Sequence, residues 1–231
     1  MAVICENRMI TPEIGVMVVE AEKESRPGQF YMLRLEQGQD PFLPRPLSVF
    51  DYENGKVSFC YRVLGRGTEL LSKLRAGDEI GLIGPLGNGF PLEGEKAVLI
   101  GGGLGIVPLY YLAKALKERG IQVEVFLGYS GEPFLKEEFE SVGKTNINIG
   151  GYVTDDVDFS KQATFYTCGP EPMMRVAAKK MQGENPLWVS LESRMACGLG
   201  ACLGCSRKMK HGNRRICKDG PVFDAREVYY E

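Results

Sequence analysis

The sequence predicts an antiparallel β-barrel, followed by an α/β domain and a small C-terminal lobe. Up to about residue 92, short runs of β-branched and aromatic residues alternate with Gly, Pro, Asn and Asp, which is typical of a barrel. From about residue 94 strands alternate with helices, which favours a parallel sheet. Four of the seven cysteines lie in the last segment. We therefore expect domains at residues 1–93, 94–191 and 192–231.

Composition and charge exclude several classes of function. The 231 residues are 44% apolar and 25% charged, which is ordinary for a globular protein. The net charge of −2, with both signs interspersed, provides no basic surface for nucleic acid or an anionic membrane. No run approaches the ~18 apolar residues of a spanning helix. Scattered single cysteines at 5, 60 and 168 suit a reducing compartment, so we expect a cytoplasmic protein.

Four short motifs follow one another in the predicted barrel: PGQF (27–30), RPLS (45–48), YRVLGRGT (61–68) and GPLGNGF (84–90). In this order they resemble the FAD domain of the ferredoxin–NADP reductase superfamily. There the arginine of R-x-x-S/T pairs with the FAD diphosphate, and the hydroxyl residue lies near the redox-active flavin nitrogen. A guanidinium fork suits a diphosphate, and glycines let backbone N–H groups approach phosphate. The resemblance implies FAD contacts from Arg45, Pro46, Leu47, Ser48, Arg62, Val63, Leu64, Gly67 and Thr68.

A glycine-rich turn marks the α/β domain. The strand KAVLI runs into Gly101–Gly105, a helix ending at Gly120 and a second strand, an arrangement that brings dinucleotide phosphates to a helix N-terminus. Pro108 stands where G-x-G-x-x-G has its last glycine, and the same superfamily departs from that fingerprint in this way. It also has a later Cys-Gly-Pro turn, although Cys168 alone would equally suit a small buried thiol. The resemblance implies nicotinamide nucleotide contacts from Gly101, Gly102, Gly103, Gly105, Cys168, Gly169 and Pro170.

The nucleotide is expected to be NAD rather than NADP. No basic cluster follows the second strand to hold a 2′-phosphate. The single histidine, His211, argues against a mechanism based on histidine acid–base chemistry.

The cysteines of the last segment, Cys197, Cys202, Cys205 and Cys217, form a C-x4-C-x2-C-x11-C pattern. This is the plant-type spacing of a [2Fe-2S] cluster, and the small residues between the ligands let backbone N–H groups approach the sulfides. A structural zinc site and disulfides are the alternatives. Zinc ribbons usually pair two C-x2-C motifs, so the pattern favours four ligands of an iron–sulfur cluster.

The order of the modules, with MACGLGACLGC (195–205) and CKDGPVFDAREV (217–228), closely resembles the electron-transfer subunits of dihydroorotate dehydrogenase B. Members of this family carry FAD and a [2Fe-2S] cluster and form a heterotetramer with an FMN-containing catalytic subunit. They pass electrons from dihydroorotate oxidation, a step of pyrimidine biosynthesis, to NAD. The resemblance therefore implies an NAD-linked oxidoreductase subunit. The basic insert at 206–216 is either a solvated hairpin or a contact for an acidic partner surface.

Two other functions remain open. One is a self-contained NADH-dependent flavin and iron–sulfur reductase for another acceptor, which would be expected to carry a larger ferredoxin domain. The other is a binding module with a zinc lobe and no redox activity. A flavin between the other two carriers favours electron transfer, because nicotinamide moves electron pairs and the cluster moves single electrons.

Overall fold

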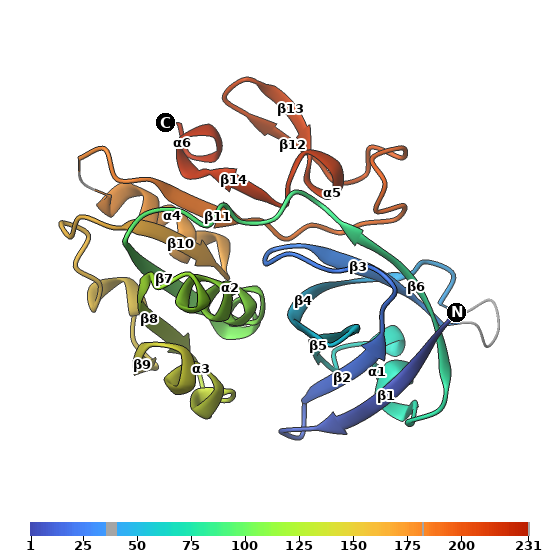
Figure 1. Ribbon diagram of the computed structural model, residues 1–231. Coiled ribbons are helices and arrows are strands. Elements are labelled where there is room, and N and C mark those ends of the chain that lie inside the picture. Colours follow the sequence, from blue (N-terminus) through green and yellow to red (C-terminus); the bar gives the residue numbers. More distant parts are fainter. Residues whose placement is uncertain (36–40, 182, 231) are drawn as a thin grey trace.

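The computed structural model describes residues 1–35, 41–181 and 183–230. A β-barrel and an α/β domain lie side by side, and the C-terminal segment runs across the top of both (Figure 1). In this part of the chain no helix is long and apolar enough to cross a membrane.

The barrel is closed and antiparallel, as predicted. Its core contains fully buried aromatic and branched side chains, including Val49, Phe59 and Tyr61. The helix α1 (Arg66–Lys73) follows the fifth strand. The strands, in spatial order, are β1 (Ala2–Met9), β2 (Ile14–Glu20), β5 (Lys56–Arg62), β4 (Arg45–Glu53), β3 (Phe30–Arg34) and β6 (Glu79–Leu86), with β6 pairing back to β1.

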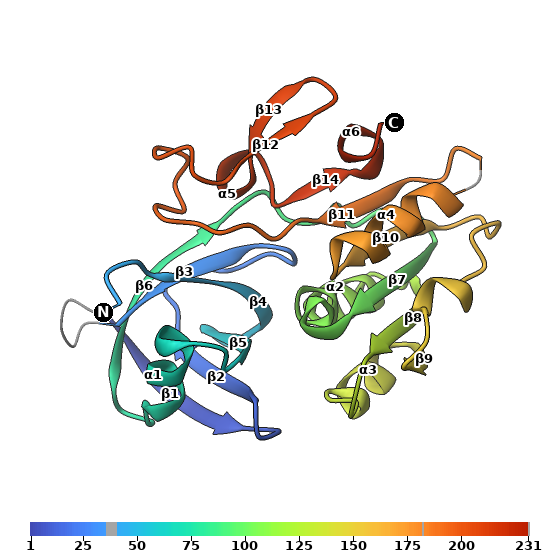
Figure 2. The ribbon, with the colours of Figure 1, turned by 180° about the vertical axis from the view of Figure 1, so that it is seen from behind.

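The α/β domain is built on a six-stranded sheet. Strand β7 is buried on both faces, because Ala97 and Leu99 pack against α2 and α3, whereas Val98 and Ile100 pack on the side of α4. Figure 2 shows these two helix layers from behind. The helices are α2 (Val107–Glu118), α3 (Lys136–Val142) and α4 (Glu171–Lys180). The strands are, in spatial order, β14 (Val222–Asp224), β11 (Leu187–Ser190), β10 (Thr164–Cys168), β7 (Lys96–Gly102), β8 (Gln122–Tyr129) and β9 (Lys144–Ile149), parallel except for β14.

The C-terminal segment leaves the sheet at β11 and returns to it at β14. Between them lie the cysteine-bearing loop, a hairpin and the short helix α5 (Ile216–Asp219), and α6 (Ala225–Val228) follows β14. The hairpin consists of β12 (Ser206–Met209) and β13 (Gly212–Arg215), so the basic insert is a hairpin. Strand β14 comes from beyond residue 192 and pairs with β11, so the C-terminal segment contributes to the sheet. The predicted domain boundaries at 93/94 and 191/192 stay a prediction.

Helix α2 and the segment after β6 both contribute contacts that join the barrel to the rest of the molecule. Helix α2 packs against β4, where the Phe50 and Tyr110 rings stack at 4.7 Å and Lys114 Nζ pairs with Asp51 at 3.0 Å. After β6, the Asn88 amide donates to the Val222 carbonyl oxygen at 2.7 Å and accepts from the Val222 N–H at 3.2 Å. These contacts hold the barrel, the sheet and the C-terminal segment together around their junction.

Candidate functional site

A cavity of about 210 Å³ lies at this junction, at the carboxyl end of the parallel strands, where open α/β sheets bind their ligands. Its lining is mainly apolar with a few hydroxyl groups. The barrel contributes Phe30, Pro46, Leu47, Ser48 and Cys60; the glycine-rich loop and α2 contribute Leu104, Val107 and Pro108; the remaining residues are Ser190, Leu191, Glu192, Ser193, Met195 and Pro221. The structure thus brings three of the predicted flavin residues next to the predicted nucleotide loop.

A larger hollow of about 520 Å³ lies at the opposite end of the parallel strands, near the amino ends of β7 and β8. Its charged residues are partly paired, since Glu124 makes ion pairs with Lys144 and Lys161. None of the residues that line this hollow is a predicted flavin, nucleotide or cluster residue. We therefore assign the candidate site to the smaller cavity.

A cationic region continues from the cavity to the start of α1. Arg45 opens β4, and its side chain lies directly over Gly67, where an added Cβ would be 2.9 Å from the arginine Cδ and Nη1. The Thr68 hydroxyl accepts a hydrogen bond from the Leu64 N–H at 3.0 Å and fixes the turn before the helix. The first N–H groups of a helix lack intrahelical partners and favour anions. The guanidinium and the helix start together suit a diphosphate.

Arg62, at the end of β5, has a buried Nε for which the described residues provide no hydrogen-bond partner. An unsatisfied buried donor is costly, so this atom marks a place where a bound group would supply an acceptor. Val63 follows it, and the apolar side chain of Leu64 is 81% exposed. An orphaned donor beside an exposed apolar surface fits a cofactor that has both polar and aromatic parts, as FAD does.

The glycine-rich loop and the Cys-Gly-Pro turn lie side by side, because β7 and β10 are neighbours in the sheet and Cys168 pairs with Gly101. A Cβ added at Gly105 would lie 2.5 Å from the Cys168 carbonyl oxygen, and one at Gly102 would lie 2.9 Å from Pro170 Cδ. Gly103 differs from both, since it has a φ of +54° and open space where a Cβ would point. The loop therefore packs on the turn through Gly105 and offers a free backbone surface at Gly103.

Glu192 lines the cavity, and the Cys168 thiol lies within range of its charge. The Cys168 thiol is buried, and desolvation raises its pKa, so it is neutral. Desolvation also raises the pKa of the Glu192 carboxyl, although this side chain still reaches solvent. The sequence analysis missed Glu192. Its position directly after the apolar strand β11 was the one available signal.

The four cysteines of the C-terminal segment lie in two pairs. The Cys205 thiol donates to Cys217 Sγ at 3.3 Å, and both are buried. Cys197 Sγ accepts from the N–H groups of Cys202 at 3.5 Å and Leu199 at 3.4 Å, and these hydrogen bonds lower the pKa of Cys197 to about 6. All four thiols are free. Four thiols in two pairs, one already favoured as a thiolate, are a suitable donor set for a two-iron cluster.

Within the described ranges, no group of three or more His, Cys, Asp or Glu side chains is gathered closely enough to hold one metal ion.

Comparison with known families gives consistent names. Residues 192–229 match the model of the iron-sulfur cluster binding domain of dihydroorotate dehydrogenase B. A protein from Clostridium acetobutylicum, named dihydroorotate dehydrogenase B (NAD(+)), electron transfer subunit, is 42% identical over 97% of this chain and 95% of its own length. A protein of the same name from Bacillus caldolyticus is 41% identical over 88% of this chain and 86% of its own length.

Solved structures agree on the fold. An NADH-dependent reduced ferredoxin-NADP oxidoreductase, studied for flavin-based electron bifurcation, superposes with a TM-score of 0.87 at 31% identity, covering 99% of this chain and 89% of that chain. The FAD/NAD binding domain of nitric oxide dioxygenase from Vibrio cholerae gives 0.72 at 17% identity, covering 84% and 98%. The predicted ferredoxin reductase-like fold with an iron–sulfur segment is therefore confirmed.

Proposed function

The chain belongs to the family of dihydroorotate dehydrogenase B electron transfer subunits, and we propose that it passes electrons from an FMN-containing dihydroorotate dehydrogenase subunit to NAD⁺. Bound FAD supplies the exchange between the single electrons of a [2Fe-2S] cluster and the electron pairs of nicotinamide. One observation carries the proposal. The stretch Ser190–Met195 lines the cavity, and Cys197 follows two residues later. The flavin site and the cluster ligands thus share one continuous segment.

On this proposal the barrel holds FAD. The Arg45 fork and the start of α1 bind the diphosphate, and Arg62 Nε gains the acceptor that it lacks. Ser48 provides a hydroxyl in the cavity, where Pro46 and Leu47 shape the apolar wall. Val63 and Leu64 lie before α1, and Gly67 and Thr68 lie in its first turn.

The glycine-rich loop and the Cys-Gly-Pro turn take the nicotinamide nucleotide. Gly103 admits the phosphates, because nothing lies within 4 Å of the position where a side chain would begin. Gly101, Gly102, Gly105, Gly169 and Pro170 keep the two turns in contact beside the cavity. The relatives' names specify NAD(+), in agreement with the absence of a basic cluster after β8 in the sequence.

The cysteine loop is proposed as the docking face of the catalytic subunit. Cys197, Cys202, Cys205 and Cys217 hold the cluster, and Cys202 lies at the surface. The apolar side chains of Leu199 and Leu203, on either side of it, are 57% and 60% exposed. Lys208 and Lys210 on the hairpin add exposed positive charge. This surface suits a partner with an apolar centre and an acidic rim, in a heterotetramer in the reducing cytoplasm.

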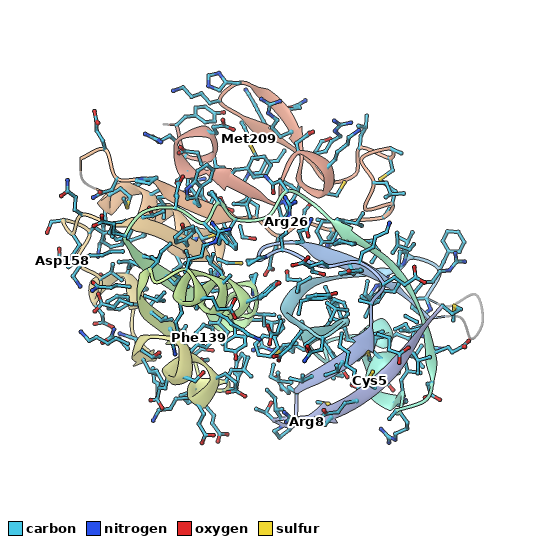
Figure 3. The ribbon with its side chains drawn as sticks, in the orientation of Figure 1. Cys5, Arg8, Arg26, Phe139, Asp158 and Met209 are labelled. Atoms are coloured by element: carbon cyan, nitrogen blue, oxygen red, sulfur yellow. The ribbon has the colours of Figure 1, made fainter. Side chains whose placement is uncertain are left out.

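Cofactor analysis tests the proposal. The chain purified without oxygen is expected to contain about two irons, about two sulfides and about one FAD. Cys202→Ser should lose the iron, whereas Cys5→Ser should keep it, because Cys5 lies in β1 on the far side of the barrel (Figure 3). Stoichiometric zinc without iron in the parent, or iron retained in Cys202→Ser, would contradict the cluster assignment.

A further inference from the structure

Four side chains from three segments meet between the β12–β13 hairpin and the start of α4. They are Glu171 and Arg175 from α4, Arg207 from β12, and Tyr229 from the residues after α6; we call this group the Glu171 clamp. The hairpin also contacts α6 directly, because the Lys210 N–H donates to the Glu227 carbonyl oxygen at 2.9 Å. Met209, the last residue of β12, is buried and packs in the same core as Ala225 and Val228 of α6 (Figure 3).

The centre of the clamp is a two-pronged ion pair. Arg207 Nη1 donates to Glu171 Oε2 at 2.9 Å, and Arg207 Nη2 donates to Glu171 Oε1 at 2.6 Å. The Arg207 side chain is 29% exposed and that of Glu171 is 40% exposed. The Tyr229 ring packs against Arg175 at 5.2 Å and against Arg207 at 6.0 Å. Such a planar fork fixes the direction of both side chains, unlike a flexible surface pair.

The Arg207–Glu171 ion pair lies close in sequence to both the cluster ligands and the Cys-Gly-Pro turn. Arg207 lies two residues after the proposed cluster ligand Cys205, and Glu171 lies two residues after Gly169 of the Cys-Gly-Pro turn. Gly169 in turn packs backbone to backbone on the glycine-rich loop, where an added Cβ would be 2.9 Å from the Gly102 carbonyl oxygen. The Arg207–Glu171 ion pair therefore joins the cluster segment to the nicotinamide site.

We propose that Arg207 and Glu171 are positioning residues that couple cluster occupancy to NAD affinity. The cluster orders the loop that carries β12, β12 presents Arg207, and Arg207 holds the Cys-Gly-Pro turn against the glycine-rich loop. Loss of the cluster releases the turn and weakens NAD binding. Linkage requires the reverse effect as well, so that bound NAD⁺ favours retention of the cluster. This inference rests on the proposed function.

A double-mutant cycle on NAD⁺ affinity tests the coupling in the full chain with its cofactors. Glu171→Gln and Arg207→Gln are each expected to raise the Kd for NAD⁺ about fivefold. The double variant should bind NAD⁺ no more weakly than either single variant, because the same contact is broken in all three. The matched control is Asp155→Asn, which removes the Lys180 ion pair at the other end of α4 and should leave the Kd unchanged.

Cluster removal provides the second arm. Cys202→Ser is expected to raise the Kd for NAD⁺ by a similar factor in the parent background and to have no further effect in Arg207→Gln. FAD content and the unfolding temperature are measured alongside, because a merely structural role would lower both and give additive effects on the Kd.

Additive effects, or an unchanged Kd in Glu171→Gln and Arg207→Gln, would overturn the coupling while the parent still binds NAD⁺. A parent that does not bind NAD⁺ would instead contradict the proposed function.

Discussion

At the scale of single residues, two arginines define the proposed flavin site. Arg45 lies over the first turn of α1, and Arg62 carries a buried Nε without an acceptor in the described structure. A hydrogen bond between charged groups contributes about 1.5–3 kcal/mol. Removal of the Arg45 guanidinium should therefore lower the affinity for the cofactor rather than the stability of the fold, because the Arg45 side chain lies outside the barrel core.

Arg45→Ala is expected to weaken FAD binding about tenfold or more, which corresponds to that range of free energy. NAD⁺ affinity should change less, since the nucleotide loop is untouched. The control is Arg8→Ala, which removes an exposed pair with Glu6 on β1 of the same barrel (Figure 3). FAD retained per chain after gel filtration is the measurement, and equal retention in Arg45→Ala and the parent would count against the assignment.

How far sequence predicts such residues depends on their separation along the chain. The four cysteines were predictable, because three lie within nine residues and their spacing is specific to the cluster type. The Glu171 and Arg207 pair was not, because its members are 36 residues apart and a single charge in sequence looks like a solvated surface group. Glu192 was missed for the same reason, since its place in the cavity lining arises from the meeting of three segments.

At the scale of elements, the loop between β7 and α2 separates two roles of glycine. Gly105 has no room for a side chain because the Cys168–Gly169 backbone lies against it, whereas Gly103 faces open space with φ at +54°. Gly120, after the other end of α2, also has a positive φ of +76° and open space. These two open glycines therefore form a matched pair.

Gly103→Ala and Gly120→Ala should each cost about 1 kcal/mol of stability, because both force alanine into the left-handed region. Only Gly103→Ala should also weaken NAD⁺ binding, since its new methyl group would point toward the proposed phosphates. Urea unfolding gives the first quantity and NAD⁺ titration the second. Equal NAD⁺ affinity in the two variants would argue that the loop is only structural.

Local patterns predicted the elements with strong apolar periodicity and missed those defined by distant contacts. The antiparallel barrel and the unit β7–α2–β8 were predicted. Strand β1 was not, because Ile4 is its one buried residue and the strand therefore shows little apolar alternation. Strand β14 has three residues, and its place in the sheet depends on pairing with β11 more than 30 positions earlier in the chain.

At the scale of the whole molecule, one cavity joins all three parts of the chain. Among the described residues, its lining offers one carboxylate, Glu192, and no lysine or histidine. Dihydroorotate oxidation requires a positioned base beside a hydride acceptor. We therefore expect that chemistry to take place in the partner subunit, with this chain acting as the route to NAD⁺.

The most direct test is NAD⁺ reduction driven by dihydroorotate, followed through nicotinamide absorbance. The chain alone should oxidise NADH with an artificial one-electron acceptor but show no dihydroorotate-dependent reaction. Addition of the catalytic subunit should give that reaction, and the complex carrying Cys202→Ser should lose it while retaining FAD. Dihydroorotate-dependent NAD⁺ reduction by the chain alone, or at the parent rate in the Cys202→Ser complex, would contradict the account.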